Sequence, residues 1–374
     1  MSLSNLFGHK AFRMMAVLTL VFSLLAVNFG AVFATQGQPG AVYVQTNQAG
    51  GNEIAIFNRS ADGALAFAGT ATTGGLGTGS GLGSQGSVIL SNDGRWLFAV
   101  NAGSNEISAF RVDASGLTLT DKVSSGGVRP TSITIYKDLL YVLNAGSTGN
   151  IAGFTVDPSG KLSALAGSTR PLSGDATAPA QVSFSRDGGM LVVTERATSM
   201  IDTYLVGNDG LASGPAVHPS SGVTPFGFAF TQQGALIVSE AFGGAALGSA
   251  VSSYDVSNGG LDVVSASVPT GQTAACWIAV SKNGKFAYST NAGSNSVSAY
   301  RVGTDGSLSL IDGAAGASGE GPIDASVNNN GQFLYVLNSR SHNISAFAVQ
   351  ADGTLVSLGI LEGLPAGSAG ITAW

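Results

Sequence analysis

The stretch FAYSTNAGSNSVSAYRVGTDGSL, residues 286–308, contains the unit from which most of the chain is built. Val297 and Tyr300 lie three residues apart, Gly306 follows the tyrosine by six residues, and Leu308 comes two residues later. An apolar strand, a polar turn with Asp-Gly and a second strand are typical of a β-hairpin. The stretch therefore predicts two neighbouring antiparallel strands.

The same unit occurs seven times along the chain. Its Ile or Val and aromatic pairs are Ile54/Phe57, Ile107/Phe110, Ile151/Phe154, Ile201/Tyr204, Val251/Tyr254, Val297/Tyr300 and Ile344/Phe347. Successive aromatics are 53, 44, 50, 50, 46 and 47 residues apart, and polar turns upstream, such as Lys282-Asn283-Gly284, add a second hairpin to each unit. Repeats of this length with four short strands predict an all-β, seven-bladed β-propeller.

The two ends of the chain predict how the ring closes. We name the strands of each blade A to D from the central axis outward. Residues 41–44 match strand B, so the first unit lacks strand A, whereas residues 370–374 match a strand A with nothing after it. We therefore expect the C-terminal strand to join the N-terminal blade, so that no sheet edge stays open at the seam. Residues 35–374 then form a single domain.

Composition excludes several classes of protein. The chain has 374 residues, 44% of them hydrophobic and 10% charged, so it is neither disordered nor a charged coiled coil. Its formal net charge of −6 argues against nucleic acid as a partner, because phosphate binding depends on clustered Lys and Arg. The lone Cys276 cannot form an intramolecular disulfide. We expect a monomer.

The first 34 residues have the pattern of an export signal. Lys10 and Arg13 precede an uncharged apolar stretch that ends at Ala34, where short residues suit cleavage. We expect residues 1–34 to be a signal peptide and the mature protein to be secreted or extracytoplasmic. An uncleaved membrane anchor is the alternative, because the apolar stretch is just long enough to span a bilayer.

Polar residues recur on the face where the D-to-A and B-to-C connections emerge. The ends of the B strands supply Asn101, Asn144, Glu195, Glu240, Asn291 and Asn338, so two acids interrupt an asparagine set. The starts of the A strands add Arg129, Gln181, Phe226, Trp277 and Asp324, and Arg196 follows Glu195. Two insertions, residues 73–86 and 242–250, fall on this face. We expect a shaped pocket there.

Each of these residues has a structural alternative. The asparagines are expected to cap turns, and contact of Asn101, Asn144, Asn291, Asn338 and Asp324 with a substrate is the functional hypothesis. Glu195 and Glu240 are either solvated rim carboxylates or functional acids, and Arg129 and Arg196 either pair with them or bind a ligand. The Gly-rich insertion is interpreted as a flexible loop, and Cys276 as a small buried strand residue.

No standard catalytic constellation is present. The sequence lacks G-x-S-x-G, H-E-x-x-H and a Cys pair, and only two histidines, His218 and His342, lie outside the predicted signal peptide. A His-rich metal site is excluded by that count, although scattered carboxylates could still hold Ca²⁺. We expect no cofactor and assign no metal ligands.

Several units resemble the seven-bladed lactonase family, which includes 6-phosphogluconolactonase-like enzymes and carboxymuconate-lactonising cyclases. Residues 140–144, LYVLN, and 157–162, DPSGKL, carry this resemblance, which extends over residues 40–374. It implies that Glu240, or Glu195, takes part in the reaction of the lactone. The family's Gly-Pro-Arg-His segment corresponds to residues 224–227, TPFG, so its Arg and His are absent here.

The resemblance implies a lactone hydrolase. Opening a lactone needs a base for water and a positive or hydrogen-bonding group for the oxyanion. Glu240 or Glu195 would be the base, and Arg129 or Arg196 would hold the oxyanion or a substrate carboxylate. The motif around residues 101–105, NAGSN, also resembles YVTN-type surface propellers, which implies a non-catalytic module that binds a surface carbohydrate or protein.

Overall fold

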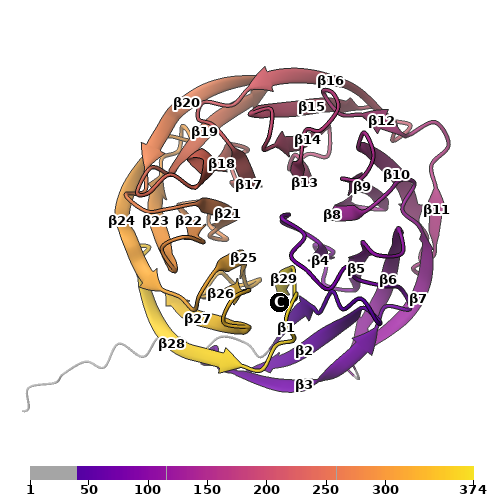
Figure 1. The fold of residues 1–374 in the computed structure, drawn as a ribbon, viewed down its shortest axis with the longest axis horizontal. Coiled ribbons are helices and arrows are strands. Elements are labelled where there is room, and N and C mark those ends of the chain that lie inside the picture. The colour runs from indigo at the N-terminus through magenta and orange to yellow at the C-terminus, as the bar shows by residue number, and fades with distance from the viewer. Residues whose placement is uncertain (1–39, 115, 258) are drawn as a thin grey trace, which may run out of the picture. The chain divides into compact units, whose positions relative to one another are not determined.

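The computed structural model describes residues 40–374 apart from residues 115 and 258. The predicted signal peptide, residues 1–34, lies outside the described residues. Seven antiparallel sheets are arranged around a central axis (Figure 1), as the repeat predicts. Within the described part of the chain, no helix is both long enough and apolar enough to cross a bilayer.

The first three blades follow the predicted order of strands. Blade 1 contains β29 (Ile371–Ala373), β1 (Gly40–Gln45), β2 (Glu53–Arg59) and β3 (Leu65–Thr72). Blade 2 contains β4 (Val88–Leu90), β5 (Trp96–Asn101), β6 (Glu106–Asp113) and β7 (Gly116–Ser124). Blade 3 contains β8 (Pro130–Tyr136), β9 (Leu139–Asn144), β10 (Asn150–Val156), β11 (Leu162–Ala164) and the short β12 (Arg170–Pro171).

The other four blades repeat this arrangement. Blade 4 contains β13 (Pro179–Phe184), β14 (Met190–Glu195), β15 (Met200–Val206) and β16 (Ala212–Pro219). Blade 5 contains β17 (Pro225–Phe230), β18 (Leu236–Glu240), the 3₁₀ turn η1 (Phe242–Gly244), β19 (Ala250–Ser257) and β20 (Gly260–Pro269). Blade 6 contains β21 (Ala275–Val280), β22 (Phe286–Asn291), β23 (Ser296–Val302) and β24 (Leu308–Ala317), and blade 7 contains β25 (Pro322–Val327), β26 (Phe333–Asn338), β27 (Asn343–Val349) and β28 (Leu355–Glu362).

The C-terminal strand closes the ring as predicted. In the pairing of β29 with β1, Ile371 lies opposite Val44 and Ala373 lies opposite Val42. The Trp374 N–H donates to the Ala41 carbonyl at 2.8 Å, and the Arg59 Nε donates to the Trp374 oxygen at 3.1 Å. Blade 1 therefore has four strands taken from both ends of the described chain.

The repeated hairpin glycine is explained by contact between blades. Gly63 has a φ of 92°, and a Cβ at this position would lie 2.5 Å from the Phe333 ring of blade 7. The Gly63 carbonyl also accepts a hydrogen bond from the buried Tyr335 hydroxyl at 2.7 Å. The equivalent bonds join Tyr288 to Gly353 and Tyr141 to Gly210. Each such glycine lets one blade pack closely on the preceding one.

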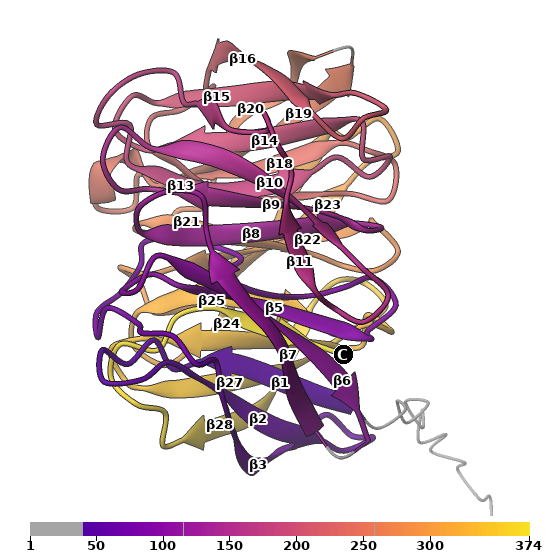
Figure 2. The same ribbon diagram turned by 90° about the vertical axis from the view of Figure 1, so that its right-hand side faces the viewer.

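Side chains also join the A strands around the axis. Ser132 Oγ accepts the Val182 N–H at 3.1 Å, and Gln181 Oε1 accepts the Phe228 N–H at 2.7 Å. These bonds satisfy backbone groups that an edge strand would otherwise leave unpaired. We call the face with the D-to-A and B-to-C connections the upper face. The C-terminus, which ends an A strand, lies at the opposite, lower face (Figure 2).

Replacing Gly63 by Ala should destabilise the propeller by about 1–3 kcal/mol, because the new methyl group clashes with Phe333 and the left-handed φ disfavours a side chain. The midpoint of chemical denaturation measures this effect. Gly50→Ala is the matched control, since no atom lies within 4 Å of its Cβ position and its φ is outside the left-handed range. Equal stability of the two variants would contradict the packing explanation.

Candidate functional site

The asparagines at the ends of the B strands are buried within their blades. Asn101, Asn144, Asn291 and Asn338 are each 0% exposed. The Asn291 Nδ2 donates to Ser298 Oγ at 2.9 Å, and the Asn338 Nδ2 donates to Ser345 Oγ at 2.9 Å. These amides thus join strand B to strand C, rather than capping the turns as expected. Their contact with a substrate stays a prediction.

Glu240 occupies the same position at the end of β18 and is also fully buried. Its Oε1 accepts the Gly222 N–H at 2.7 Å and the Ser252 hydroxyl at 2.5 Å, and its Oε2 accepts the Ser267 hydroxyl at 2.7 Å. Three donors from the D-to-A segment, strand C and strand D therefore surround the carboxylate. In this arrangement Glu240 stabilises blade 5, and no water-exposed oxygen is available to activate a nucleophile.

Glu195 forms a buried pair of carboxyl groups with Asp202 of β15, and both side chains are 0% exposed. The Ser173 hydroxyl donates to Glu195 Oε2 at 2.5 Å, and the Ser173 N–H donates to Asp202 Oδ2 at 3.0 Å. Burial and then the adjacent Glu195 raise the pKa of Asp202 to about 8. The pair therefore holds a proton at neutral pH.

Asp202 was missed by the sequence analysis, although the repeat contained a signal for it. The residue directly after the Ile or Val of each repeat is small in the other six units: Ala55, Ser108, Ala152, Ser252, Ser298 and Ser345. An aspartate at this position stands out once the units are aligned. The blade that replaces Asn by Glu195 also replaces Ser by Asp202.

Arg196 and two aromatic rings form a cluster at the upper end of the channel. The Arg196 guanidinium lies 4.8 Å from the centroid of the Phe226 ring, and this ring meets Trp277 edge to face at 4.9 Å. Burial lowers the pKa of Arg196, and the charge of Arg129 adds to this effect. Arg129 itself is exposed. The structure thus brings together three residues predicted on this face, Arg196, Phe226 and Trp277, and the charge of Arg129 acts on the same cluster.

Neither arginine pairs with a predicted acid. Among residues 40–374, apart from the two that the structure does not describe, the ion pairs are Arg95–Asp93, Arg111–Asp113 and Lys122–Glu106. The expectation that Arg129 and Arg196 pair with Glu195 or Glu240 is therefore wrong. Two neighbouring guanidinium groups without a carboxylate partner favour an anion at the upper mouth.

The Gly-rich insertion lies across the axis at the upper face (Figure 1). The Gln85 Nε2 donates to the Ile278 carbonyl at 2.8 Å, and the Gln85 N–H donates to the Ala180 carbonyl at 3.1 Å. A Cβ on Gly83 would come within 3.2 Å of the Arg196 guanidinium. The glycine-rich composition predicts a flexible loop, but these contacts anchor the insertion to blades 4 and 6. We call residues 83–86 the plug.

Asp324 lies in the channel below the plug and is 2% exposed. Its carboxylate accepts the N–H groups of Ala325 at 2.8 Å and Ile371 at 3.1 Å, and also that of Gly86. Burial raises the pKa of Asp324 to about 7. The channel has a volume of about 630 Å³ and reaches the lower-face turns at Arg186 and Lys282. Asp324 therefore joins the plug to the closing strand.

Cys276 lies beside this cluster and is buried, as predicted. Burial raises the pKa of its thiol to about 12, so the thiolate that a nucleophile requires is scarce at neutral pH. In the described part of the chain, no three His, Cys, Asp or Glu side chains come together in an arrangement that could hold a metal ion.

The ring of seven antiparallel sheets places the protein in the class of β-propellers. The family model "Lactonase, 7-bladed beta-propeller" matches residues 38–174 and 247–360, so the chain belongs to this family, as the resemblance implied. The match omits residues 175–246, the segment that contains Glu195, Arg196 and Glu240. No curated protein matches the chain.

Solved structures share the fold at low sequence identity. A candidate 6-phosphogluconolactonase from Bacteroides fragilis superposes with a TM-score of 0.71 at 20% identity, covering 90% of this chain and 98% of its own. The periplasmic gluconolactonase of Pseudomonas aeruginosa gives 0.68 at 19% identity, covering 88% and 98%. Hydrazine synthase of Kuenenia stuttgartiensis gives 0.60 at 15% identity, covering 83% and 95%. At these identities the likeness shows the fold alone.

The stability of the protein should fall as the pH rises from about 5 to 8. In the unfolded chain Asp202 has the ordinary aspartate pKa of 3.8, whereas in the folded chain its pKa is about 8, so rising pH favours unfolding. Asp202→Asn should reduce the slope by up to about 1.4 kcal/mol per pH unit. Denaturant titrations at several pH values measure it. The exposed Asp175→Asn is the control, and unchanged slopes in both variants would contradict the shared proton.

Proposed function

We propose that this lactonase-family propeller acts outside the cytoplasm and binds a small organic acid, such as a sugar acid, at its upper mouth. The observation that carries the proposal is the position of Arg129 and Arg196. Their charges are close enough to interact, and no carboxylate of the described residues forms an ion pair with either. A bound anion would relieve the repulsion between these like charges.

The surroundings of Arg196 support a binding role. Its Nε donates to the Ala178 carbonyl at 3.0 Å, and its guanidinium group lies over the Phe226 ring, so the side chain is held in place before a ligand arrives. Such preorganisation reduces the entropy lost on binding. Arg129 is exposed and supplies the second, more adaptable positive group.

The glutamates favour binding over hydrolysis. Glu240 and Glu195 are fully buried, and each accepts hydrogen bonds from several protein donors. A general base must reach the water that it activates, directly or through one other water. The segment containing both residues also lies outside the match to the family model. Binding without ring opening therefore fits this geometry best.

The compartment is argued from the N-terminus. Lys10, Arg13 and the apolar stretch to Ala34 have the order of an export signal, and residues 35–374 carry a formal net charge of 14 − 22 = −8. An acidic propeller outside the cytoplasm would attract an anion only where cations gather locally. The upper mouth is such a place.

Isothermal titration with gluconate, 6-phosphogluconate and glucono-1,5-lactone tests the binding site. Arg129→Gln should weaken binding of the anions by about tenfold or more, because it removes one charge-assisted hydrogen bond. Arg170→Gln, on strand β12 of blade 3, is the matched control and should bind like the parent. An anion affinity that both variants leave unchanged would place the ligand away from the upper mouth.

Lactone hydrolysis is the second candidate, and the Glu195–Asp202 pair favours it, because carboxyl groups with raised pKa values gather at catalytic sites. A pH-stat assay with glucono-, 6-phosphoglucono- and muconolactone separates the two functions. We expect no ring opening above the rate in buffer. Turnover that is lost in folded Glu240→Gln or Glu195→Gln protein would overturn the binding proposal and establish a hydrolase.

A further inference from the structure

The lower face contains a recess that the proposed function does not use. Four residues, 136–139, separate the paired Ile135 and Leu140 in the A-to-B turn of blade 3. Six residues, 91–96, separate the equivalent Leu90 and Leu97 in blade 2, and six separate the equivalent pair in blade 4. The turn of blade 3 is therefore two residues shorter than those on either side of it.

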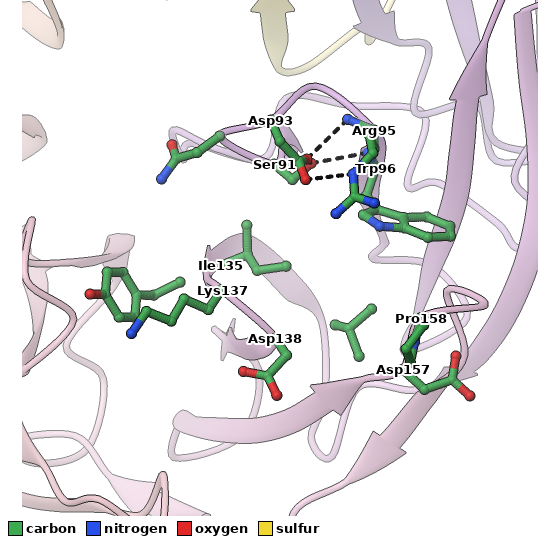
Figure 3. Close-up of a pocket in the computed structure, with 12 residues that line it drawn as sticks. Ser91, Asp93, Arg95, Trp96, Ile135, Lys137, Asp138, Asp157 and Pro158 are labelled. Atoms are coloured by element: carbon green, nitrogen blue, oxygen red, sulfur yellow. Dashed lines mark hydrogen bonds and ion pairs between the residues drawn. The ribbon is translucent and has the colours of Figure 1, made fainter.

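The shorter turn leaves a cavity between blades 2 and 3 (Figure 3). Its volume is about 520 Å³, within the range of roughly 300–1,000 Å³ that is typical of small-ligand sites. Trp96, Ile135, Tyr136, Val156 and Pro158 supply its apolar surface. Trp96 and Tyr136 are half-buried, so part of each ring remains accessible.

Polar groups at the rim of this cavity are available to a ligand. Asn92, Lys137 and Asp138 are exposed, and within the described residues their side chains donate or accept no hydrogen bond. The Asp157 Oδ1 accepts the N–H groups of Ser159 and Lys161, whereas its Oδ2 has no partner in that part of the chain. The rim thus offers an amide, an ammonium group and carboxylate oxygens, which are both donors and acceptors.

The charges of the rim argue against an anionic ligand. The Arg95 guanidinium is already paired with Asp93 at 2.6 Å. Lys137 remains, and the same cavity is lined by two further carboxylates, Asp138 and Asp157. Its ammonium group also lies 5.1 Å above the Tyr136 ring. A phosphate or uronic acid would meet a net negative rim, whereas a neutral, hydroxyl-rich ligand can use every group.

A second recess lies on the other side of the same short turn. Its volume is about 390 Å³, and residues 136–139 line it together with Thr155, Asp187, Asn208 and Asp209. The ligand-binding surface would thus extend over blades 2, 3 and 4. The turn between the two recesses is a closed hairpin without a free strand edge, so it offers no template for an extended peptide.

We propose that this surface binds an uncharged oligosaccharide. Sugar rings have apolar C–H groups that can contact the accessible parts of the Trp96 and Tyr136 rings, and their hydroxyl groups both donate to carboxylates and accept from amide and ammonium groups. The two adjacent recesses fit a chain of several sugar units lying across the short turn. The site is independent of the anion site at the upper mouth.

Titration calorimetry with cellohexaose, maltohexaose and hexa-N-acetylchitohexaose tests the proposal. We expect at least one of them to bind with at least tenfold higher affinity than hexagalacturonate, because the rim repels the acid. Replacing Lys137-Asp138 by Asn-Asp-Gly-Arg, the sequence of residues 92–95, lengthens the turn and fills the recess. This variant should bind the sugar at least tenfold more weakly.

A matched control separates the effect of the longer turn from that of the four new residues. The same four residues placed at 282–285 of blade 6 leave that turn at its natural length, and sugar affinity should not change. If the lengthened variant does not fold, the exposed Asn92→Ala/Asp138→Ala pair should weaken binding at least fivefold. The proposal is overturned if none of the three sugars binds, if the lengthened or doubly substituted protein binds as tightly as the parent, or if hexagalacturonate or a Gly-Ser-Thr hexapeptide binds equally well.

Discussion

The pairing of β29 with β1 is the contact on which the rest of the molecule depends. It joins residues more than 320 positions apart, and without it β1 would present an open edge. Because every blade packs on two neighbours, an opening at one place would expose apolar surface on both adjoining blades. The Arg59 contact with Trp374 and the Asp324 contact with Ile371 hold this seam from two sides.

Buried polar contacts also organise the upper face. At the ends of the B strands the side chains turn into the blade, where Asn–Ser bonds, Glu240 with its three donors, or the Glu195–Asp202 pair join neighbouring strands. Acids placed there stabilise the scaffold from within. The groups available to a ligand are those of the D-to-A and B-to-C connections, above all Arg129 and Arg196. Proteins that share this fold can thus present different side chains to a ligand.

Periodicity explains which features could be predicted. The spacing of Val297, Tyr300 and Gly306 and their six counterparts depends on local hairpin geometry, so the number of blades and the ring closure could be read directly from the sequence. The direction of the Asn291 and Glu240 side chains could not, because the end of a strand is where alternation between faces breaks down. The path of Gln85 was also hidden, since its partner Ile278 is 193 residues away and a glycine-rich stretch carries no periodic signal.

The plug affects how a small molecule can reach the central channel. It runs directly into β4, and its Gly86 shares the Asp324 carboxylate with the closing strand, so it cannot swing aside without disturbing the innermost layer of two blades. Gln85 and Gly86 of the plug line one end of the channel, and Arg186 and Lys282 line it at the lower face. A molecule that enters from the side of Arg186 and Lys282 would therefore meet the plug at the far end of the channel.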